Sequence, residues 1–421
     1  MAIRSGVENL PPAGELIPLF IVVVALLGII ARPWRSRAWQ WSLGAAALVE
    51  LLPFRASPGA VWTAWWNARD VAFFLLGILT IADVSAKARL FEVAAERLLA
   101  LSGGRRLALL AWLFGLGTLS TAVLSNDTTV IALTPAVLVL AAALRERAAP
   151  YAYACALVAN AGSFVLPIAN PANLLLYGAA LPPLLGWLRV FALPSIAALA
   201  ITFVVLAWLF RRELGGGFER SLQVEALRPG ERAVLWAVLF AVALLLAASL
   251  FQRPPGLAAL LGAAVVLGTG LLTGTFGRED LRRIDLGVLP FVAGLLVLLA
   301  AIEATGLLAG LRVLLQAPGA GHSAVAVGFL GAVASALANN LPIAALAASL
   351  SSAGAAAGVH RALVIAIDLG PNFALSGSLA TLLWAQMLRK HGMRASAREF
   401  ARIGIACTLP ALAAALLLAR F

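Results

Sequence analysis

The sequence predicts an all-α polytopic membrane protein, with about ten transmembrane helices and two re-entrant hairpins in two inverted repeats, and with broken helices at the bilayer midplane. Three observations favour this fold class: the composition, the recurrence of long apolar runs, and polar helix-breaking stretches that occur in both halves. Of the 421 residues, 62% are hydrophobic and only 12% are charged, an apolar share well above that of a soluble domain. We therefore expect the chain to be integral to a membrane.

Apolar runs long enough to cross a bilayer recur along the whole chain. A hydrocarbon core of roughly 30 Å needs about 20 apolar residues in a helix. The runs are continuous and do not alternate with polar residues, which favours helices over a β-barrel. We expect apolar spans near residues 16–31, 38–54, 70–86, 107–124, 129–144, 151–178, 184–210, 233–250, 257–274, 286–302, 323–338, 341–356, 362–388 and 400–420.

The basic residues give a formal net charge of +12, and they lie in short segments between the apolar spans. Such a distribution sets membrane topology by the positive-inside rule and does not indicate nucleic-acid binding. We therefore expect no nucleic-acid partner. The clusters placed on the cytoplasmic side are those at residues 32–37, 87–106, 145–147, 211–232, 278–283 and 389–402.

The segment 107–144 has basic clusters at both ends, so a single straight crossing is excluded. It forms either two complete crossings with an outside turn, or a hairpin that enters from the cytoplasmic side and returns. Its polar centre, "SNDTT" (125–129), fits the hairpin better, because irregular backbone at membrane depth is tolerated where it lines a cavity inside the protein. We predict a re-entrant hairpin over residues 107–144.

The second half repeats this plan. Asn339 and Asn340 lie between two apolar arms, which predicts a second hairpin over residues 323–356 that enters from the outside. Further along, the stretch 158–178 aligns without gaps with 366–386. The paired positions in this alignment are Asn160 with Asp368, Gly162 with Gly370, Asn170 with Ser378, and Asn173 with Thr381.

Following the chain across the membrane gives five crossings in each half, with the N- and C-termini outside. The domains predicted from this count are a first repeat over residues 1–210, a cytoplasmic linker over 211–232, and a second repeat over 233–421. An odd number of crossings inverts the second half relative to the first. Inverted repeats whose broken helices meet at the midplane are a recurrent plan of secondary transporters.

Polar residues gather at both hairpin tips and in the two aligned stretches, next to glycines and prolines that unwind helices. One Asn, Ser or Thr taken alone more often joins two membrane helices than binds a ligand. Four such stretches, paired between the halves, are poorly explained by packing, and ionisable residues at membrane depth are functional by default. The predicted substrate-binding residues are Ser125, Asn126, Thr128, Asn160, Asn170, Asn173, Asn339, Asn340, Asn372, Ser376 and Ser378, and the predicted proton-coupling residues are Asp127 and Asp368.

The charges of this set restrict the substrate. It holds two carboxyl groups and no arginine or lysine, so a polyanion would be repelled, whereas a cation, a proton or an uncharged polyhydroxyl species would not. Asp127 stands opposite Asn340, and Asp368 opposite Asn160, which gives one titratable group to each half. Burial raises a carboxyl pKa toward the physiological range. We expect Asp127 to be the more important, because a hairpin tip is the more exposed during alternating access.

Catalytic, metal and cofactor sites are not expected, because no nucleophile–base pair or ligand cluster is present in the sequence. Cys155 and Cys407 lie far apart inside apolar spans. We expect each to be a small buried residue, with no role as a thiolate ligand.

The motifs resemble those of the ArsB-type arsenite/antimonite efflux permeases of the ion transporter superfamily. The stretches that carry the resemblance are "SNDTTVIALTP" (125–135), "LPIANPANLLLYG" (166–178), "ANNLP" (338–342) and "DLGPNFALSGSLATLLW" (368–384). The resemblance implies extrusion of trivalent arsenic or antimony hydroxide through the inner membrane, driven by proton entry, alone or with a soluble ATPase partner.

Two other functions remain open from the residues. A proton-coupled sodium antiporter would use the same two aspartates as cation ligands. A carboxylate symporter would be expected to have two Ser-Asn-Thr tips, whereas these tips read "SND" and "ANN". The linker 211–232 would be the contact for an ATPase partner, although a flexible connector between the halves is the interpretation we favour for it.

Overall fold

The computed structural model describes residues 37–50, 58–218, 225–304, 324–351 and 357–419, together with a few separate positions between 17 and 28. Within these ranges the chain is almost entirely helical, and its only β-type pairing is one isolated bridge between Arg105 and Gly217. The predicted all-α fold class is confirmed. The number of membrane crossings stays a prediction, because the predicted first span, 16–31, is described only at those separate positions.

The first half contains two long helices, a hairpin and a broken helix. The predicted span 151–178 is interrupted, as expected for a helix broken at the midplane. The elements are α2 (Ala38–Glu50), α3 (Pro58–Lys87), α4 (Leu90–Leu101), α5 (Arg106–Leu124), α6 (Asn126–Ala143), α7 (Ala149–Ala161), η3 (Pro167–Ala169), α8 (Pro171–Tyr177), η4 (Gly178–Ala180) and α9 (Leu184–Leu209).

The second half has the same order of features. A hairpin is again followed by a broken helix and one long final helix. The elements are α10 (Pro229–Leu250), α11 (Pro255–Leu272), η5 (Arg278–Arg283), α12 (Val288–Ala304), α14 (Ala324–Ala338), α15 (Asn340–Ser351), α16 (Ala357–Leu369), η6 (Gly370–Phe373), α17 (Leu379–Lys390) and α18 (Ala397–Leu418).

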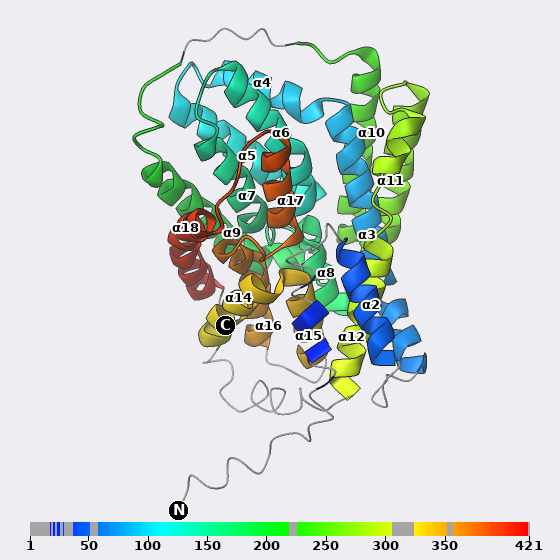
Figure 1. The fold of residues 1–421 in the computed structure, drawn as a ribbon. Coiled ribbons are helices and arrows are strands. Elements are labelled where there is room, and N and C mark those ends of the chain that lie inside the picture. The colour runs from blue at the N-terminus through cyan, green and yellow to red at the C-terminus, as the bar shows by residue number, and fades with distance from the viewer. Residues whose placement is uncertain are drawn as a thin grey trace, which may run out of the picture.

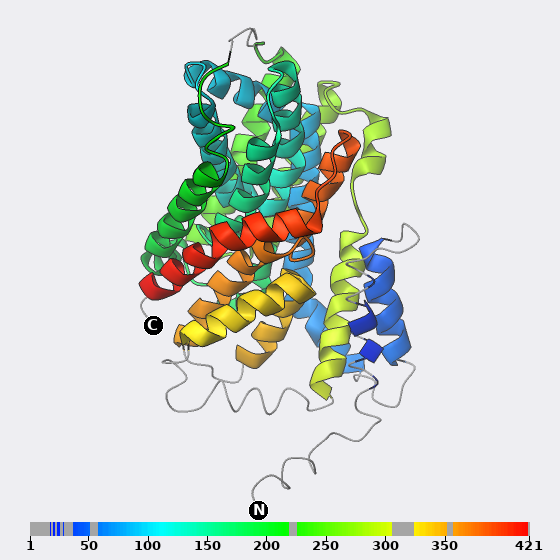
Figure 2. The same cartoon turned by 60° about the vertical axis from the view of Figure 1, so that its left-hand side comes forward.

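The two hairpins approach the middle of the molecule from opposite ends. In Figures 1 and 2, α5 and α6 extend to the end where α4 lies, whereas α14 and α15 extend to the end where α12 lies. We call these the α4 end and the α12 end. The halves interlock, because α6 packs against α17 of the second half and α15 packs against α8 of the first. Each hairpin therefore contacts the broken helix of the other half.

Among the described residues, six helices are long and apolar enough to cross a membrane, and α5 and α6 are among them. Length alone would therefore permit two complete crossings. The turn between them, however, is enclosed by protein: Ser125 is fully buried, and the Thr128 hydroxyl lies 3.5 Å from the carbonyl of Ile78, well inside the 30-residue helix α3. A turn at that depth favours the re-entrant hairpin over an outside loop.

Four of the six segments that carry the predicted basic clusters, 87–106, 145–147, 211–232 and 278–283, meet at the α4 end. Ion pairs there join segments that are distant in sequence: Lys87–Asp280 (3.2 Å), Arg89–Glu225 (2.9 Å), Arg106–Glu146 (2.7 Å) and Arg147–Glu213 (3.6 Å). The convergence agrees with the expectation that these clusters share one side of the membrane. The side itself stays a prediction.

Helix α4 follows α3 directly and is amphipathic. The two helices are bent by 61° at residues 88–89, and α4 turns Phe91, Val93 and Leu99 inward.

The described parts of the linker are held in place. The amide of Phe218 donates to the carbonyl of Gly104 (2.9 Å), and the Arg106 guanidinium donates to the carbonyl of Gly215 (2.9 Å). Arg89 donates to Glu225, and this hydrogen bond lowers the pKa of that carboxyl. The two described ends of the predicted linker are therefore anchored to the first half. They do not form the flexible connector that we favoured from the sequence.

Candidate functional site

The helix breaks are built from glycine and proline, as the sequence indicates. Between α7 and α8 stand Gly162, Pro167 and Pro171. The Gly162 amide still donates to the carbonyl of Val158 (2.8 Å) and ends α7, whereas the two prolines lack the N–H that would continue the helix. Between α16 and α17 the chain comes close to other helices. A side chain at Gly370 would collide with the backbone of Ala332 in α14, so this position requires glycine.

The backbone confirms the alignment of the two broken helices. Asn160 and Asp368 are each the last residue but one of the first arm, α7 or α16. Asn170 and Ser378 each cap the second arm: their side chains accept a hydrogen bond from the amide of Ala172 (3.0 Å) and of Thr381 (3.1 Å), respectively. Such N-caps satisfy amide groups that a helix start leaves unpaired.

Each cap also contacts the first arm of the other half. The Asn170 amide donates to Asp368 Oδ1 (2.5 Å), and the Ser378 hydroxyl donates to Asn160 Oδ1 (3.2 Å). The Asn160 amide in turn donates to Asn372 Oδ1 (2.8 Å), in η6. We call the pairs Asn170–Asp368 and Ser378–Asn160 the two crossover contacts. They join the broken helices at the centre of the interface between the halves.

The hairpin tips share an unusual backbone conformation. Ser125 and Asn339 have positive φ angles of 115° and 73°, and each directly precedes the second helix of its hairpin. A positive φ is uncommon for residues other than glycine, and Asn tolerates it better than most. The matching strain at both tips supports their equivalence.

This backbone match corrects one expectation. Because α6 begins at Asn126 and α15 begins at Asn340, the counterpart of Asn340 is Asn126. Asp127 therefore stands opposite Leu341, and its predicted pairing with Asn340 is wrong by one residue. The sequence alignment matched residue types at the tips, whereas the backbone turn fixes the register.

The second tip is joined to the break of its own half. The Asn340 amide nitrogen donates to the carbonyl of Gly377 (2.8 Å), and the Asn339 side chain donates to the carbonyl of Ser376 (3.4 Å). The Ser376 hydroxyl donates to the carbonyl of Ala336 (3.3 Å). These residues therefore hold the segment between η6 and α17 against the second hairpin.

The first tip has its own hydrogen bonds. Asn126 Oδ1 accepts from the amide of Asp127 (2.9 Å), and the Ser125 and Thr128 hydroxyls lie 3.3 Å apart. Within the part of the chain that the structure describes, no hydrogen bond joins this tip to the crossover contacts; packing of α6 against α17 and α7 brings it to them.

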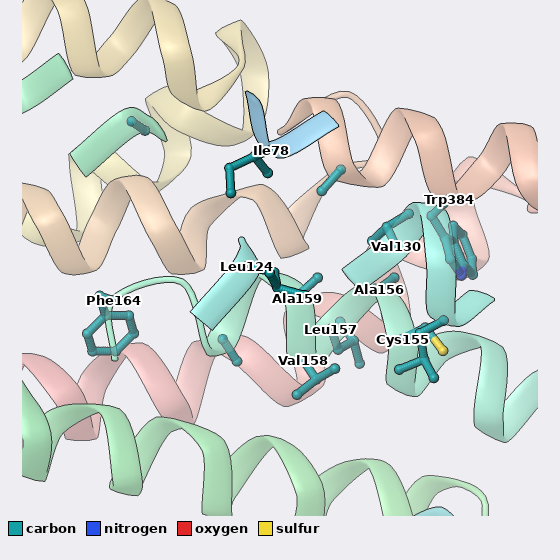
Figure 3. Packing of buried hydrophobic residues seen from close by; sticks show 14 of the residues in the cluster. Ile78, Leu124, Val130, Cys155, Ala156, Leu157, Val158, Ala159, Phe164 and Trp384 are labelled. Atoms are coloured by element: carbon teal, nitrogen blue, oxygen red, sulfur yellow. The ribbon is translucent and has the colours of Figure 1, made fainter. Parts of the chain in front are cut away.

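The predicted site residues lie in the protein interior. All thirteen except Ser376 are at most 5% exposed, and Ser376 is partly buried. Apolar side chains pack in the same region: Leu124 and Val130, which flank the first tip in the sequence, belong to the buried cluster drawn in Figure 3, together with Leu157 and Val158 of α7. Polar groups enclosed in this way cost free energy unless they find partners.

Three buried acceptor oxygens of the site have no donor among the described residues: Asp127 Oδ1, Asn173 Oδ1 and Asp368 Oδ2. The Asn173 amide donates elsewhere, to the carbonyl of Ser163 (2.9 Å). An unsatisfied buried polar atom costs about 1–3 kcal/mol, so this arrangement favours a ligand that supplies hydrogen-bond donors or positive charge.

Sequence reasoning missed two groups that support the site. The Ser335 hydroxyl donates to the carbonyl of Ile367 (3.2 Å), next to Asp368. The indoles of Trp187 and Trp384 donate to the carbonyls of Phe164 (3.0 Å) and Ala152 (2.8 Å). A signal was present for Ser335, which precedes Asn339 by one helical turn. The tryptophans could not be told from packing residues.

Other kinds of site are not favoured. Cys155 and Cys407 are free and buried, as expected, and neither lies at a tip or a break. Among the described residues, no group of three or more His, Cys, Asp or Glu could hold a metal ion.

The fold and the site define a multi-pass membrane transporter. Its hairpins enter from opposite ends, its broken helices meet between them, and buried polar groups lie at the breaks. A family model described as "Citrate transporter" (CitMHS) matches residues 16–370, and the chain belongs to this family. It is 28% identical to the "Arsenical pump membrane protein" of Escherichia coli (strain K12), over 93% of this chain and 95% of that protein. The resemblance to ArsB-type permeases of the ion transporter superfamily, predicted from the motifs, is confirmed.

Two solved structures share the fold. The YdaH transporter of Alcanivorax borkumensis superposes with a TM-score of 0.57 at 15% identity, covering 97% of this chain and 98% of that one. MtrF of Neisseria gonorrhoeae, whose structure is described as illuminating a class of antimetabolite efflux pumps, gives a TM-score of 0.53 at 13% identity, covering 98% and 95%. At these identities the likeness concerns the fold alone.

Proposed function

We propose that this chain extrudes trivalent arsenic and antimony hydroxides, arsenite and antimonite, from the cytoplasm in exchange for protons. The observation that carries the proposal is the shortage of hydrogen-bond donors at the site, where Asp127, Asn173 and Asp368 each leave a buried acceptor unpaired. The name of the Escherichia coli relative supports the choice of metalloid.

The substrate chemistry matches these acceptors. Trivalent arsenic hydroxide is largely uncharged at neutral pH and carries three hydroxyl groups, each of which donates one hydrogen bond and accepts others. The Asn170 amide and the Ser378 hydroxyl, which donate to Asp368 and Asn160, supply additional polar contacts. We expect the substrate to replace some of these protein–protein hydrogen bonds, since the side chains already satisfy one another in part.

Citrate, named in the description of the family model, fits the site less well. A carboxylate only accepts hydrogen bonds, and it would face two carboxyl groups. Among the described residues, no arginine or lysine takes part in the hydrogen bonds of the tips and breaks. Sodium would suit the free carboxylate oxygens, so it belongs in the experiment as the competing substrate.

Proton exchange is assigned to Asp368 and Asp127. An unpaired carboxylate away from water is expensive, and protonation relieves the cost. The sequence favours Asp127. The crossover contact instead argues for Asp368, because its protonation state acts directly on the hydrogen bond from Asn170 that joins the two halves. We propose that Asp368 carries the coupling and that Asp127 assists.

Alternating access would move the repeats 1–210 and 233–421 about the crossover contacts, a motion typical of inverted-repeat transporters. In this proposal the α4 end faces the cytoplasm, the termini lie outside, and the membrane is the inner membrane. A cysteine placed at 102–104 or 146–148, in a background without Cys155 and Cys407, should then react only with a reagent applied to the cytoplasmic side. Equally ready labelling of positions 125–128 from the outside would contradict the first hairpin.

A soluble ATPase partner, if one is used, would contact the linker 211–232. Gly215, Phe218 and Glu225, which are anchored to the first half, would form part of that contact surface. Binding of the purified partner to vesicles that expose this side is the test.

The substrate is tested in inverted membrane vesicles with an acidic interior. We expect arsenite and antimonite to accumulate and the accumulation to collapse when the pH gradient is dissipated. Sodium and citrate are measured in parallel vesicles. Uptake of sodium without uptake of arsenite would replace this function by sodium antiport, and uptake of citrate alone would replace it by carboxylate transport.

A further inference from the structure

A groove of about 270 Å³ lies at the α4 end, separate from the tips and breaks. It is lined by Arg97 of α4, by Ala226 and Leu227 of the linker, and by Arg232, Leu235 and Trp236 of α10. The groove therefore spans the junction between the first half and the start of the second.

Its two arginines are available to an anion. Arg97 and Arg232 are exposed, and neither forms an ion pair within the described part of the chain. The lining contains no carboxylate.

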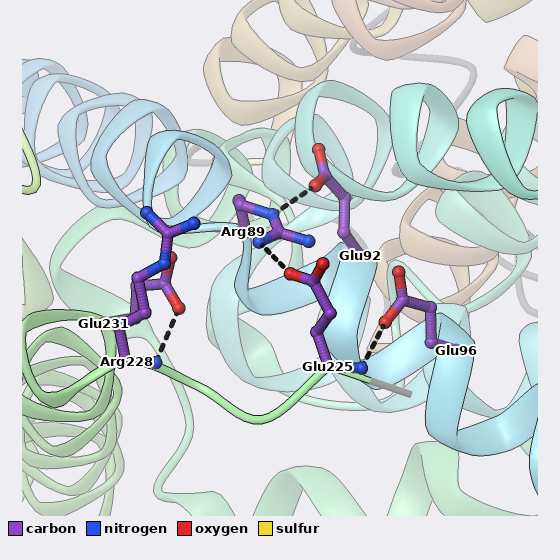
Figure 4. A network of polar contacts seen from close by, with 6 residues as sticks. All are labelled: Arg89, Glu92, Glu96, Glu225, Arg228 and Glu231. Atoms are coloured by element: carbon purple, nitrogen blue, oxygen red, sulfur yellow. Dashed lines mark hydrogen bonds and ion pairs between the residues drawn. The ribbon is translucent and has the colours of Figure 1, made fainter. Parts of the chain in front are cut away.

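The nearby glutamates are engaged elsewhere, as Figure 4 shows. Glu92 and Glu225 both accept from Arg89, at 3.0 and 2.9 Å. The other two accept from backbone amides: Glu96 from Glu225 (3.4 Å) and Glu231 from Arg228 (2.8 Å). These four carboxylates therefore bind groups other than Arg97 and Arg232, and they do not pair with the positive charges of the two arginines.

The groove also has an exposed apolar wall. Trp236 is 68% exposed and lies one turn after Arg232, on the same face of α10. Leu235 stands beside it and is partly exposed. A tryptophan near the end of an apolar helix is typical of the membrane–water interface. A ligand here would meet cationic groups at one end and a lipid-facing surface at the other.

We propose that this groove binds an anionic phospholipid, with the phosphate headgroup between Arg97 and Arg232 and an acyl chain along Trp236 and Leu235. Arginine recognises phosphate oxygens by charge-assisted hydrogen bonds. A free phosphate ion would use the arginines and leave the apolar wall uncovered, whereas a lipid covers both. The bound lipid would bridge α4 and α10 and so join the two halves at this end.

The test is native mass spectrometry of the full-length protein, released from detergent in the presence of equal amounts of phosphatidylglycerol and phosphatidylcholine. We expect phosphatidylglycerol to be retained preferentially. Arg97→Gln and Arg232→Gln should each weaken its retention roughly fivefold, since a basic residue at a membrane surface contributes about that factor. The double variant should lose the preference.

Arg253→Gln is the matched control, because this exposed arginine follows α10 at its other end; it should leave lipid retention unchanged. Trp236→Ala should weaken phosphatidylglycerol retention without changing the headgroup preference. Unaltered retention in the double arginine variant would overturn the proposal. Displacement of the lipid by inorganic phosphate, or by an acidic peptide at equal concentration, would also overturn it. None of these readouts depends on transport, so they stand apart from the proposed arsenite function.

Discussion

The two crossover contacts have the same geometry and different chemistry. In one, Asn160 accepts a hydrogen bond from Ser378 (3.2 Å); in the other, Asp368 accepts one from Asn170 (2.5 Å). The acceptor is in both cases the last residue but one of a first arm, and the donor caps a second arm. A repeated fold can therefore keep a symmetric frame and still place a titratable group in only one of its two equivalent contacts.

The hairpin tips also differ in chemistry, but here the titratable residue belongs to the first half. Both turn through a residue of positive φ, but the first tip then presents Asp127, whereas the second presents Leu341. Each half thus carries one buried carboxyl, at positions that are not equivalent. This difference lets the two aspartates be tested separately, each against a natural counterpart that does not ionise.

The largest effect is expected from Asp368→Asn. The substitution makes both crossover contacts neutral while it keeps size and much of the hydrogen bonding, so the protein should fold and bind arsenite. Accumulation driven by a pH gradient should be abolished in inverted vesicles, whereas exchange of arsenite across the membrane without a gradient should persist. Retained pH-driven accumulation would show that the ionisable contact is not the coupling site.

The next largest effect is expected from replacing the donors of the two crossover contacts, and the loss of arsenite affinity should differ between them. Asn170→Ala leaves a buried carboxyl oxygen without a donor, at a cost of about 1–3 kcal/mol, which corresponds to roughly a tenfold to hundredfold loss of apparent arsenite affinity. Ser378→Ala likewise removes a helix cap and the donor to a buried acceptor, but this acceptor is the neutral amide oxygen of Asn160; a hydrogen bond between neutral groups contributes about 1 kcal/mol, so the loss should be roughly fivefold. Equal losses, measured by the concentration dependence of uptake, would remove the distinction between the contacts.

A smaller effect is expected from Asp127→Asn. Asp127 Oδ1 has no donor among the described residues, so its replacement breaks no contact between the halves. We expect reduced but measurable accumulation against a pH gradient. Asp127→Leu, which copies Leu341, is the stricter variant. A complete loss with Asp127→Asn, equal to that of Asp368→Asn, would instead favour the hairpin tip as the main proton carrier.

The smallest effect is expected at the surface, from Arg89→Gln. Arg89 lowers the pKa of Glu225, so the contribution of this pair is present above the usual pKa of a glutamate and is lost as the pH falls through the lowered value. The pair is solvent-exposed, and such pairs contribute little. Thermal unfolding near neutral pH should therefore be almost unchanged. A large decrease in melting temperature would mean that the linker contributes to the stability of the halves.

Much of the helical framework, with its breaks and caps, could be predicted from the sequence, because the residues that form these features are close together in the chain. Glycine and proline mark the breaks, and Asn170 and Ser378 are residues that cap helices. A gapless alignment then paired them correctly, along with Asn160 and Asp368. The apolar runs also predicted the helices on either side of each break.

The rest depends on contacts that sequence patterns do not contain. The crossover contacts join residues about half a chain apart, and no periodicity encodes such a pair. The register of the tips was missed because it depends on the positive φ of Ser125 and Asn339, which residue types only suggest. The anchoring of the linker follows from its position next to Arg89 and Arg106, and only the tertiary fold brings them together.

The central claim is that Asp368 changes its protonation when arsenite binds. Infrared difference spectroscopy on the purified protein, with and without arsenite, detects the carbonyl band of a protonated carboxyl group directly. The account predicts a band that changes with arsenite in the wild type and in Asp127→Asn, and that is absent from the difference spectrum of Asp368→Asn. A band of undiminished size in Asp368→Asn would contradict the account.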